Sequence, residues 1–503
     1  MVMLTIMVLL AIGALLELGM HIRRGLWRHR VAFAIVAIAL TAFASGAFVL
    51  WAGNIWGVAI LLLSMYRILS LFRIFERRMH ERHMHRGTLY TSISLISLQL
   101  LVGVSWLVWQ EWQLSGHTYW VILAALQFVA AGISLWSVVR NMYTTAWPPR
   151  VTHYSDEELP PITVAIPARN ETDDLQECLR SVIANDYPKL EVLVFDDCSQ
   201  TPRTPEIIRS FAQDGVRFLQ GEEPSANWLP KNRAYDQLIR EASGTYVLFC
   251  GVDVRFSHNS LRQIVGTMLD RNKQMMSIIP QRTPEAYRRF SLLQAMRYWW
   301  ELVPLRRMFR RPPVLSSCWI IERTALYDAG GFKAVARSII PEAFFARRVA
   351  RMTDGYSFLR AGKREGIQSV KTTQQQLQTA VRVRYPQVHR QPEQVAVHSF
   401  LEAVFLLLPF VLAIGGFWLP IGAVAQSLAA LASVALIITH LVVVLSTRVN
   451  TWWFGVVAMP FMVLVDIFVL HYSLWRYEFS EVIWKGRNVC VPALHVFTRL
   501  PRA

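Results

Sequence analysis

The stretch "ITVAIPARNETDDLQECLRSVIANDYPKLEVLVFDDCS", residues 162–199, decides the fold of this chain. Two short apolar runs, 162–166 and 190–195, frame it, and such continuous runs are typical of strands buried on both faces. Between them, apolar residues recur at helical spacing, namely Leu175, Leu179, Val182 and Ile183. Thr172 precedes them and can serve as an N-cap. The stretch therefore predicts a strand, a helix and a second strand.

The same alternation continues along the chain. A helical pattern over 231–242 is followed by another apolar run, "TYVLFC", residues 245–250. Alternating strands and helices predict an α/β domain with a mostly parallel sheet and covering helices. Ligands of such sheets bind beyond the carboxyl ends of the strands. The acidic loops "DDCS" (196–199) and "GVD" (251–253) follow two predicted strands, so both are expected at a ligand site.

The composition of the whole chain is that of a membrane protein. Of its 503 residues, 53% are hydrophobic and the formal net charge is +17, with a mean hydropathy of +0.30. A membrane protein with basic loops combines these values. Nucleic-acid binding is not favoured, because no soluble part carries a basic stripe interleaved with aromatic residues. Five cysteines without a C-x-x-C pair suit a reducing compartment.

Apolar stretches precede the domain at about 3–20, 31–50, 56–74, 89–109 and 119–139. Each approaches the ~20 residues that cross a bilayer core. Arginines cluster in the first and third connections, whereas the second and fourth carry no Lys or Arg. The positive-inside bias then predicts an outside N-terminus and a cytoplasmic α/β domain. We therefore expect a multi-pass protein of the inner membrane.

Further apolar stretches follow the domain at about 399–418, 420–446 and 452–474. If all three crossed, the basic segment around Lys485 and Arg487 would end outside, against the bias. We expect the first stretch, which proline and glycine interrupt, to be interfacial or re-entrant. The predicted organisation is a membrane domain over 1–150, an α/β domain over 151–395 and a second membrane domain over 396–503.

Acidic side chains at strand ends and one lysine are the first candidates for chemistry. Asp196, Asp197 and Asp253 follow predicted strands, and Lys231 lies in a tight loop. A carboxylate cluster of this kind would hold Mg²⁺ or Mn²⁺, which in turn would bind a diphosphate. Alternatively, each Asp caps a turn or a helix. Their joint occurrence at corresponding strand ends favours the ligand site.

Four motifs resemble those of family 2 inverting glycosyltransferases with the GT-A fold. The stretch quoted above resembles a strand ending in P-A-R-N-E, a helix, Y-P and a strand ending in D-D-x-S. "NWLPKNRAYDQLIREASGTYVLFCGVDVRF" (227–256) is similar to the G-W-x-G-K-x-x-A helix and the strand leading into D-A-D. "IIERTALYDAGGFKAV" (320–335) is similar to an acceptor-side segment. "VIWKGRNV" (482–489) resembles an element of members that glycosylate lipids, such as bacterial ceramide-glucosyltransferase-like proteins.

The resemblance implies roles in donor binding for the matched residues. A uridine pocket would be formed by Ala168, Arg169 and Glu171, with Asp197, and Asp196 beside it, contacting the base. Lys231 would approach the base or the diphosphate. Asp253 would bind the Mn²⁺ or Mg²⁺ that stabilises the leaving nucleotide.

The resemblance also implies an acceptor side. Gly330 and Gly331 match its paired glycines, and Glu342 falls on the Asp that serves as the general base. "VRVRYPQ" has Val381 in place of the Gln of Q-x-x-R-W, followed by Arg384 and Tyr385. This departure counts against a polymer-extruding synthase and favours transfer of one sugar to a lipid-like acceptor.

Other departures concern activity itself. Gly251 removes the first acid of D-x-D, and Pro230 stands where the family has glycine. Glu342 is one methylene longer than Asp, which displaces its carboxylate by about 1 Å. Pro341 before it suits the first turn of a helix, whose N-terminus would keep Glu342 ionised.

The sequence thus predicts a membrane-bound glycosyltransferase that moves a sugar from a nucleotide-diphosphate donor, a UDP-sugar by the resemblance, to a membrane-embedded or cell-envelope acceptor. The acceptor would enter near the basic segment "RRMFRR" (306–311) and the C-terminal helices. The alternative is a catalytically inactive relative that serves as a membrane scaffold or regulator. A transporter is less well supported, because neither an internal repeat nor paired intramembrane charges are present in the sequence.

Overall fold

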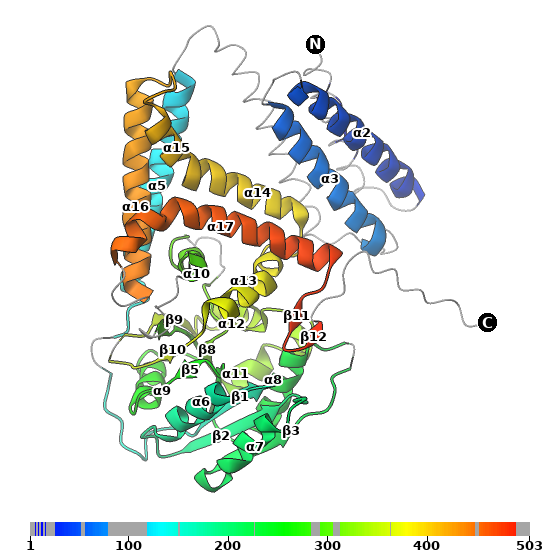
Figure 1. Cartoon of the computed structure of the whole chain (residues 1–503). Helices are drawn as coiled ribbons and strands as arrows, with labels where there is room; N and C mark the ends of the chain where they lie inside the picture. Colours follow the sequence, from blue (N-terminus) through cyan, green and yellow to red (C-terminus); the bar gives the residue numbers. More distant parts are fainter. Residues whose placement is uncertain are drawn as a thin grey trace, which may run out of the picture.

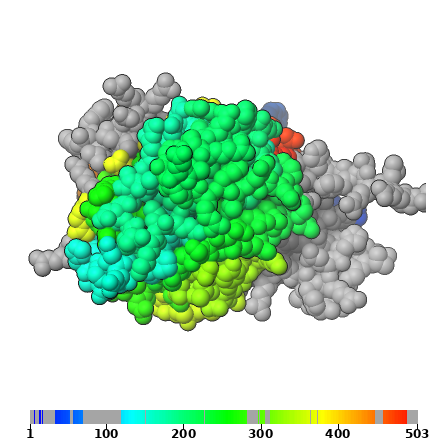
Figure 2. Space-filling view, turned by 90° about the horizontal axis from the view of Figure 1, so that it is seen from below, coloured from blue at the N-terminus to red at the C-terminus, as the bar shows by residue number. Residues whose placement is uncertain are grey.

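A computed structural model describes residues 26–51, 56–78, 118–148, 151–225, 227–282, 292–304, 312–362, 364–447 and 452–488, with residues 6, 9, 12, 13 and 16. In these residues an α/β domain occupies one end of the molecule and long helices occupy the other (Figure 1). Seen from below, the α/β domain fills the middle of the view, and the C-terminal segment, in red, reaches its edge (Figure 2). The predicted stretch 89–109 and the segment 306–311 lie wholly outside the described residues. The predicted stretch 3–20 lies almost wholly outside them.

The α/β domain is built on a seven-stranded sheet of order β3-β2-β1-β4-β8-β6-β9. All neighbours pair in parallel except β8, which is antiparallel to β4 and β6. The mostly parallel α/β fold is therefore confirmed. The strands are β1 Ile162–Ala168, β2 Leu190–Asp196, β3 Val216–Gln220, β4 Tyr246–Cys250, β6 Met275–Ile279, β8 Cys318–Glu322 and β9 Tyr356–Arg360.

Helices cover both faces of the sheet, as the buried apolar runs require. One face packs on α6 Asp173–Ile183, α7 Arg203–Ser210 and α9 Ser260–Asp270. The other packs on α8 Pro230–Glu241, α11 Arg323–Asp328, η3 Phe332–Val335 and α12 Pro341–Met352. The helix predicted after Thr172 begins there, although the Thr172 side chain makes no capping hydrogen bond. Instead Asp173 and Asp174 place negative charge in the first turn, which favours the helix N-terminus.

Short strands and two helical segments complete the domain. The short strands β5 Val254–Arg255, β10 Gln368–Ser369 and β7 Gln281–Arg282 form a small sheet. η1 Ala212–Asp214 precedes β3. α13 Thr373–Gln387 begins at a capping box in which Thr372 and Gln375 bond each other's backbone.

The remaining described helices are α2 Leu26–Trp51, α3 Trp56–Arg78, α5 Thr118–Thr144, α10 Leu292–Leu302, α14 Pro392–Glu402, the π-helix η4 Ala403–Leu407, α15 Leu408–Gly415, α16 Ala423–Thr447 and α17 Trp452–Phe479. Five segments among the described residues are long and apolar enough to cross a membrane: Phe33–Trp51, Thr118–Thr144, Pro392–Gly415, Ala423–Thr447 and Ala458–Phe479. α5 and α16 pack side by side, whereas α14 and α17 run across their direction (Figure 1).

After α17 the chain returns to the α/β domain as a short hairpin, β11 Ile483–Trp484 and β12 Arg487–Asn488. Its two turn residues, Lys485 and Gly486, have φ of 49° and 80°. Positive φ at both positions is the geometry of a type I′ turn, which matches the twist of the strands. Glycine adopts it readily, whereas Lys485 has to be held in it by contacts.

Candidate functional site

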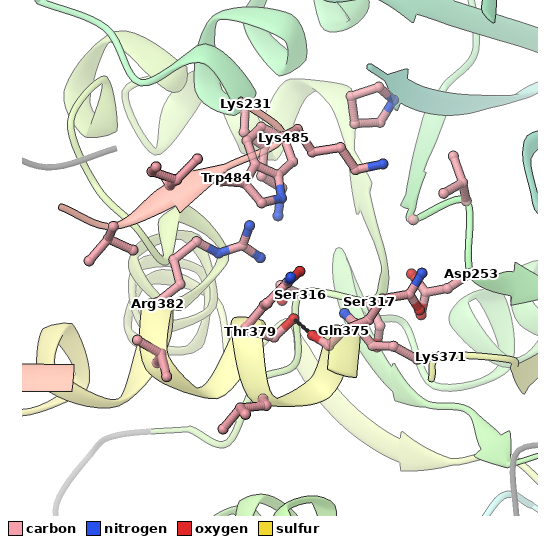
Figure 3. A pocket seen from close by; sticks show the side chains of 18 of the residues that line it. Lys231, Asp253, Ser316, Ser317, Lys371, Gln375, Thr379, Arg382, Trp484 and Lys485 are labelled. Atoms are coloured by element: carbon pink, nitrogen blue, oxygen red, sulfur yellow. Dashed lines mark hydrogen bonds between the residues drawn. The ribbon is translucent and has the colours of Figure 1, made fainter. Parts of the chain in front are cut away.

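A cleft of about 690 Å³ opens beyond the carboxyl ends of β1 and β4. β1 and the loop after it contribute Pro167 and Glu171 on one side, and the loop after β4 contributes Gly251 and Asp253 on the other. α13 lies on the other side of the cavity from Lys231 and the hairpin residue Lys485 (Figure 3), and α17 contributes Tyr472 and Arg476 to the lining. The cleft therefore lies where parallel sheets bind ligands, as the two acidic loops predicted.

The loop after β1 is fixed to the loop after β2 through Arg169. Its Nη1 donates to the carbonyl oxygens of Asp197 at 2.5 Å and Cys198 at 2.6 Å. Ala168 ends β1, and its carbonyl accepts the Asp197 amide at 2.9 Å. Asp196 caps its own loop, since its Oδ1 accepts from the Ser199 amide at 3.2 Å and from the Ser199 hydroxyl. The predicted uridine-pocket residues are thus brought together, with Asp196 in a structural role.

The C-terminal hairpin closes this pocket from outside. The Arg487 guanidinium donates to Asp197 Oδ1 at 2.6 Å and to Glu223 Oε1 at 2.7 Å. Lys485 forms an ion pair with Glu171, and its carbonyl accepts from Arg169 Nε at 2.9 Å. The resemblance singled out "VIWKGRNV" without assigning it a role, and the structure shows that its two cations reach the carboxylates of the predicted base pocket.

Burial and the hairpin cations have opposite effects on the pKa of these two carboxylates, Glu171 and Asp197. Burial raises the pKa of Glu171, and the Lys485 ammonium lowers it in part. Burial likewise raises the pKa of Asp197, against a hydrogen bond from Arg487. Burial lowers the pKa of Arg487, but its bonds to Asp197 and Glu223 raise it overall. Each hairpin cation therefore compensates a carboxylate that is costly to keep charged.

Asp253 faces the cleft next to Gly251. A Cβ built on Gly251 would lie 2.6 Å from Asp253 Oδ1, so the Asp253 carboxylate occupies the space that a side chain at 251 would need. Its other oxygen, Oδ2, accepts from the Ser369 hydroxyl at 2.9 Å. The sequence did not single out Ser369, because β10 is only two residues long and lies far along the chain.

The described residues contain no group of three or more His, Cys, Asp or Glu side chains that could hold a metal ion. A single carboxylate is nevertheless enough for Mg²⁺ or a similar hard cation when substrate phosphates and water supply the other oxygens. Asp253 at the cleft, fixed by Ser369, fits such an ion in the presence of a diphosphate.

Basic side chains dominate the lining of the cleft. Five basic residues line it, Lys231, Lys371, Arg382, Arg476 and Lys485, against three acidic ones, Glu171, Asp174 and Asp253. Arg382 points into the cavity from α13, on the other side from Lys231 and Lys485 (Figure 3). Lys231 Nζ lies 5.1 Å from the centre of the Tyr235 ring, and Arg382 lies over Trp484 at the same distance. The surplus of positive charge suits an anionic ligand.

Glu342 lies behind this lining. It is 2% exposed, in the first turn of α12 after Pro341, and is not among the residues that line the cleft. Burial, followed by the charge of Glu342, holds the pKa of Tyr235 well above its usual value. Tyr235 lines the cleft whereas Glu342 does not, and the role of Glu342 as general base stays a prediction.

The other predicted acceptor-side residues also lie away from the lining. Gly330 and Gly331 have φ of 104° and 63° in the turn after α11. Arg384 is buried, with Nε at 3.0 Å from Asp466 Oδ1 and Nη2 at 3.2 Å from Glu402 Oε1. The Tyr385 hydroxyl donates to Glu478 at 2.9 Å. Arg384 and Tyr385 therefore fasten α13 to α14 and α17.

The model of the family "Glycosyl transferase family 2" matches residues 163–329. Glycosyltransferase AglE of Haloferax volcanii is 33% identical to the chain over 120 residues, which are 22% of this chain and 38% of that protein. Glycosyltransferase GlyA of Streptococcus pneumoniae is 33% identical over 92 residues, 18% of this chain and 13% of that protein. The chain thus spans less than half the length of these relatives.

Among solved structures, the mannosyltransferase PcManGT from Pyrobaculum calidifontis, in complex with GDP-Man and Mn²⁺, is 19% identical, with a TM-score of 0.44 over 71% of this chain and 100% of that chain. Residues 163–329 thus match the family 2 glycosyltransferase model, and both named relatives are glycosyltransferases, which supports the predicted family and enzyme class. They do not favour the alternative of a catalytically inactive relative.

Proposed function

We propose that the chain is a membrane-bound inverting glycosyltransferase that moves a sugar from a nucleotide-diphosphate sugar to a lipid-like or cell-envelope acceptor. The observation that carries the proposal is the cleft itself. It combines Asp253 with a surplus of basic side chains at the carboxyl edge of a family 2 domain, and helix α17 forms part of its wall. A diphosphate needs such positive charge, and α17 contains one of the segments that are long and apolar enough to cross a membrane.

The donor is proposed to be a UDP-sugar. The uracil would lie between the loops after β1 and β2, where Arg169 and Asp197 hold each other in place. The hairpin would form the outer wall of this pocket, because Lys485 and Arg487 bridge to Glu171 and Asp197. The diphosphate would then extend towards Lys231 and Asp253.

Sugar transfer requires the cleft to stabilise the negative charge that develops on the leaving nucleotide. Asp253, oriented by Ser369, would hold Mn²⁺ or Mg²⁺, and the bound ion supplies Lewis-acid stabilisation of the diphosphate. Lys231 and Arg382 add positive charge from either side of the cavity. Glu342, which is 2% exposed at the first turn of α12, is proposed to take up the proton of the acceptor hydroxyl.

We also propose that the domain faces the cytoplasm. The arginine-rich connections before the domain support this side of an inner membrane. The hairpin contacts the domain, so the C-terminal helices have to return the chain to the same side.

The test is binding followed by turnover. UDP-glucose and UDP-N-acetylglucosamine are titrated into the full-length purified chain with and without Mn²⁺, and turnover is then measured with membrane lipid extract. We expect Mn²⁺-dependent donor binding that Asp253→Ala abolishes and Asp174→Ala, at a second acid of the same cleft, largely retains. Absence of binding of any nucleotide sugar would refute the proposed function.

A further inference from the structure

A cavity of about 770 Å³ lies where the end of α5 meets the α/β domain, apart from the cleft. Its walls come from the ends of α5, α10 and α12, from the residues that follow α9 and from the start of β9. Among the described residues, the linings of this cavity and of the cleft have no member in common. Small-molecule sites have volumes of about 300–1,000 Å³. The cavity is therefore large enough for a ligand of its own.

The cavity lies at the end of a helix that is long and apolar enough to cross a membrane. This segment is Thr118–Thr144, and its last residue, Thr144, is part of the lining. Ala146 then forms a parallel bridge with Arg360 at the end of β9. The Arg360 guanidinium also donates to the Ser446 carbonyl at 3.5 Å, in the last turn of α16. α5 and α16 thus end together beside the α/β domain (Figure 1), which places the cavity at the level of the lipid headgroups.

The charged side chains that line the cavity are Arg271, Lys273, Arg351, Glu301 and Asp354. Asp354 Oδ2 lies 3.7 Å from Lys273 Nζ, so these two charges are paired. Glu301 is buried, and its Oε2 accepts a backbone amide at 3.2 Å. Arg271 and Arg351 form no ion pair with a carboxylate in the part of the chain that the structure describes. Two cations of the lining are therefore available to an anionic ligand.

Arg271 is the better placed of the two cations. Its Nη2 donates to the Ala146 carbonyl at 3.5 Å, a long bond that uses one of the five N–H donors of a guanidinium. Partial burial lowers the pKa of Arg271, and no carboxylate among the described residues offsets this effect. A guanidinium binds phosphate through two parallel hydrogen bonds. An anion in the cavity would therefore offset the cost of burying the Arg271 charge.

We propose that this cavity binds the phosphate of an anionic phospholipid headgroup, with Arg271 as the bidentate donor and Arg351 as the second cation. The wall is fixed in advance, because the Asn141 amide donates to the Leu302 carbonyl at 2.7 Å and holds α5 to α10. A bound headgroup would secure the domain where α5 leaves the membrane. A soluble phosphate has the same chemistry, but the position at the end of α5 favours a lipid. The site does not depend on the proposed sugar transfer.

The test is calorimetric titration of the full-length chain in a neutral detergent. The ligands are dihexanoyl phosphatidylglycerol, dihexanoyl phosphatidylcholine and inorganic phosphate. We expect the phosphatidylglycerol to bind more tightly than the other two. Arg271→Gln should weaken its binding by about 10–100-fold, as the loss of charge-assisted hydrogen bonds does. Arg351→Gln should weaken it by about 5-fold, the contribution of one basic residue beside an anionic headgroup.

Arg140→Gln is the matched control, because Arg140 is an exposed residue of α5 one turn before the cavity and outside its lining. This variant should bind phosphatidylglycerol as the unchanged chain does. Equal weakening in Arg140→Gln and Arg271→Gln would mean a general attraction to a basic surface and would overturn the proposal, as would equal binding of phosphatidylcholine. Inorganic phosphate that binds as tightly, with the same dependence on Arg271, would support the phosphate site and overturn the lipid as its source. Arg351, at the exposed end of α12, decides the outcome if Arg271→Gln does not fold.

Discussion

Gly251→Ala is the most informative substitution in the cleft. Its one added methyl group tests whether Asp253, in the incomplete D-x-D motif, needs the space that Gly251 leaves open. The new Cβ would lie 2.6 Å from Asp253 Oδ1, whereas ordinary contact begins at 3.4 Å, so the carboxylate oxygen has to retreat by about 0.8 Å. Rotation of the Asp253 side chain relieves the conflict but weakens its 2.9 Å bond from Ser369. The folded domain should lose little stability.

The expected loss is in metal-dependent binding. Loss of a hydrogen bond that orients a metal ligand lowers metal affinity by about 10–100-fold. A displacement of about 1 Å in a positioned site costs about 10²-fold in rate. We therefore expect Gly251→Ala to weaken Mn²⁺-dependent UDP-sugar binding by about 10–100-fold, with its thermal unfolding close to that of the unchanged chain.

A double-mutant cycle with Asp253→Asn decides whether the loss acts through Asp253. If it does, Gly251→Ala should have little further effect in the Asp253→Asn background. Calorimetric titration of Mn²⁺ and donor into the four proteins measures this coupling. Additive losses, or a Gly251→Ala chain that binds donor as tightly as the unchanged chain, would refute the reasoning. Gly132→Ala is the matched control, since a Cβ there meets no atom within 4 Å.

Three further predictions concern the contacts that hold the cleft together. Arg384→Met leaves two buried carboxylates without their cation and should lower the free energy of unfolding by about 3–5 kcal/mol; an unchanged thermal unfolding midpoint would contradict this. Arg487→Met removes the cation bound to Asp197 and should weaken UDP binding by about 10–100-fold, as measured by calorimetry. Unchanged UDP binding would show that the hairpin is not part of the pocket. Burial raises the pKa of Glu171 and Asp197, so protonation favours the folded domain and begins at a higher pH than for exposed acids. The ion pairs need ionised carboxylates, so falling pH should move the hairpin away from the domain. Spin labels on the hairpin and α7 measure this distance, and a distance constant from neutral to acid pH would argue against it.

Much of the α/β domain could be predicted from local sequence. Continuous apolar runs set β1, β2 and β4, and the helical spacing between them set α6 and α8. Because loops after parallel strands meet at one edge of a sheet, the positions of Asp197 and Asp253 already placed the cleft. The strand and helix patterns, and the loops that follow the strands, depend on residues close together in the chain. The sequence alone is therefore enough to predict them.

The residues of α13 show where sequence reasoning stopped. The resemblance drew attention to Arg384 and Tyr385, whereas the structure places Arg382 in the cleft and Arg384 in a buried ion pair. Two residues along a helix correspond to about 200° of rotation, so the two arginines point to opposite sides. Only the packing of α17 on α13 decides which side faces the cleft.

The sequence by itself determined the α/β domain, the acidic loops at its carboxyl edge and the apolar character of the C-terminal helices. The tertiary structure decided that Lys485 and Arg487 reach Glu171 and Asp197, about 300 residues earlier in the chain. It also decided that Asp466, Ser473 and Tyr477 of α17 bond to α13, while Phe461, Phe468 and Trp475 of the same helix are exposed. Hydropathy records how apolar a helix is, but its direction is set by the side chains it packs against, which lie elsewhere in the chain.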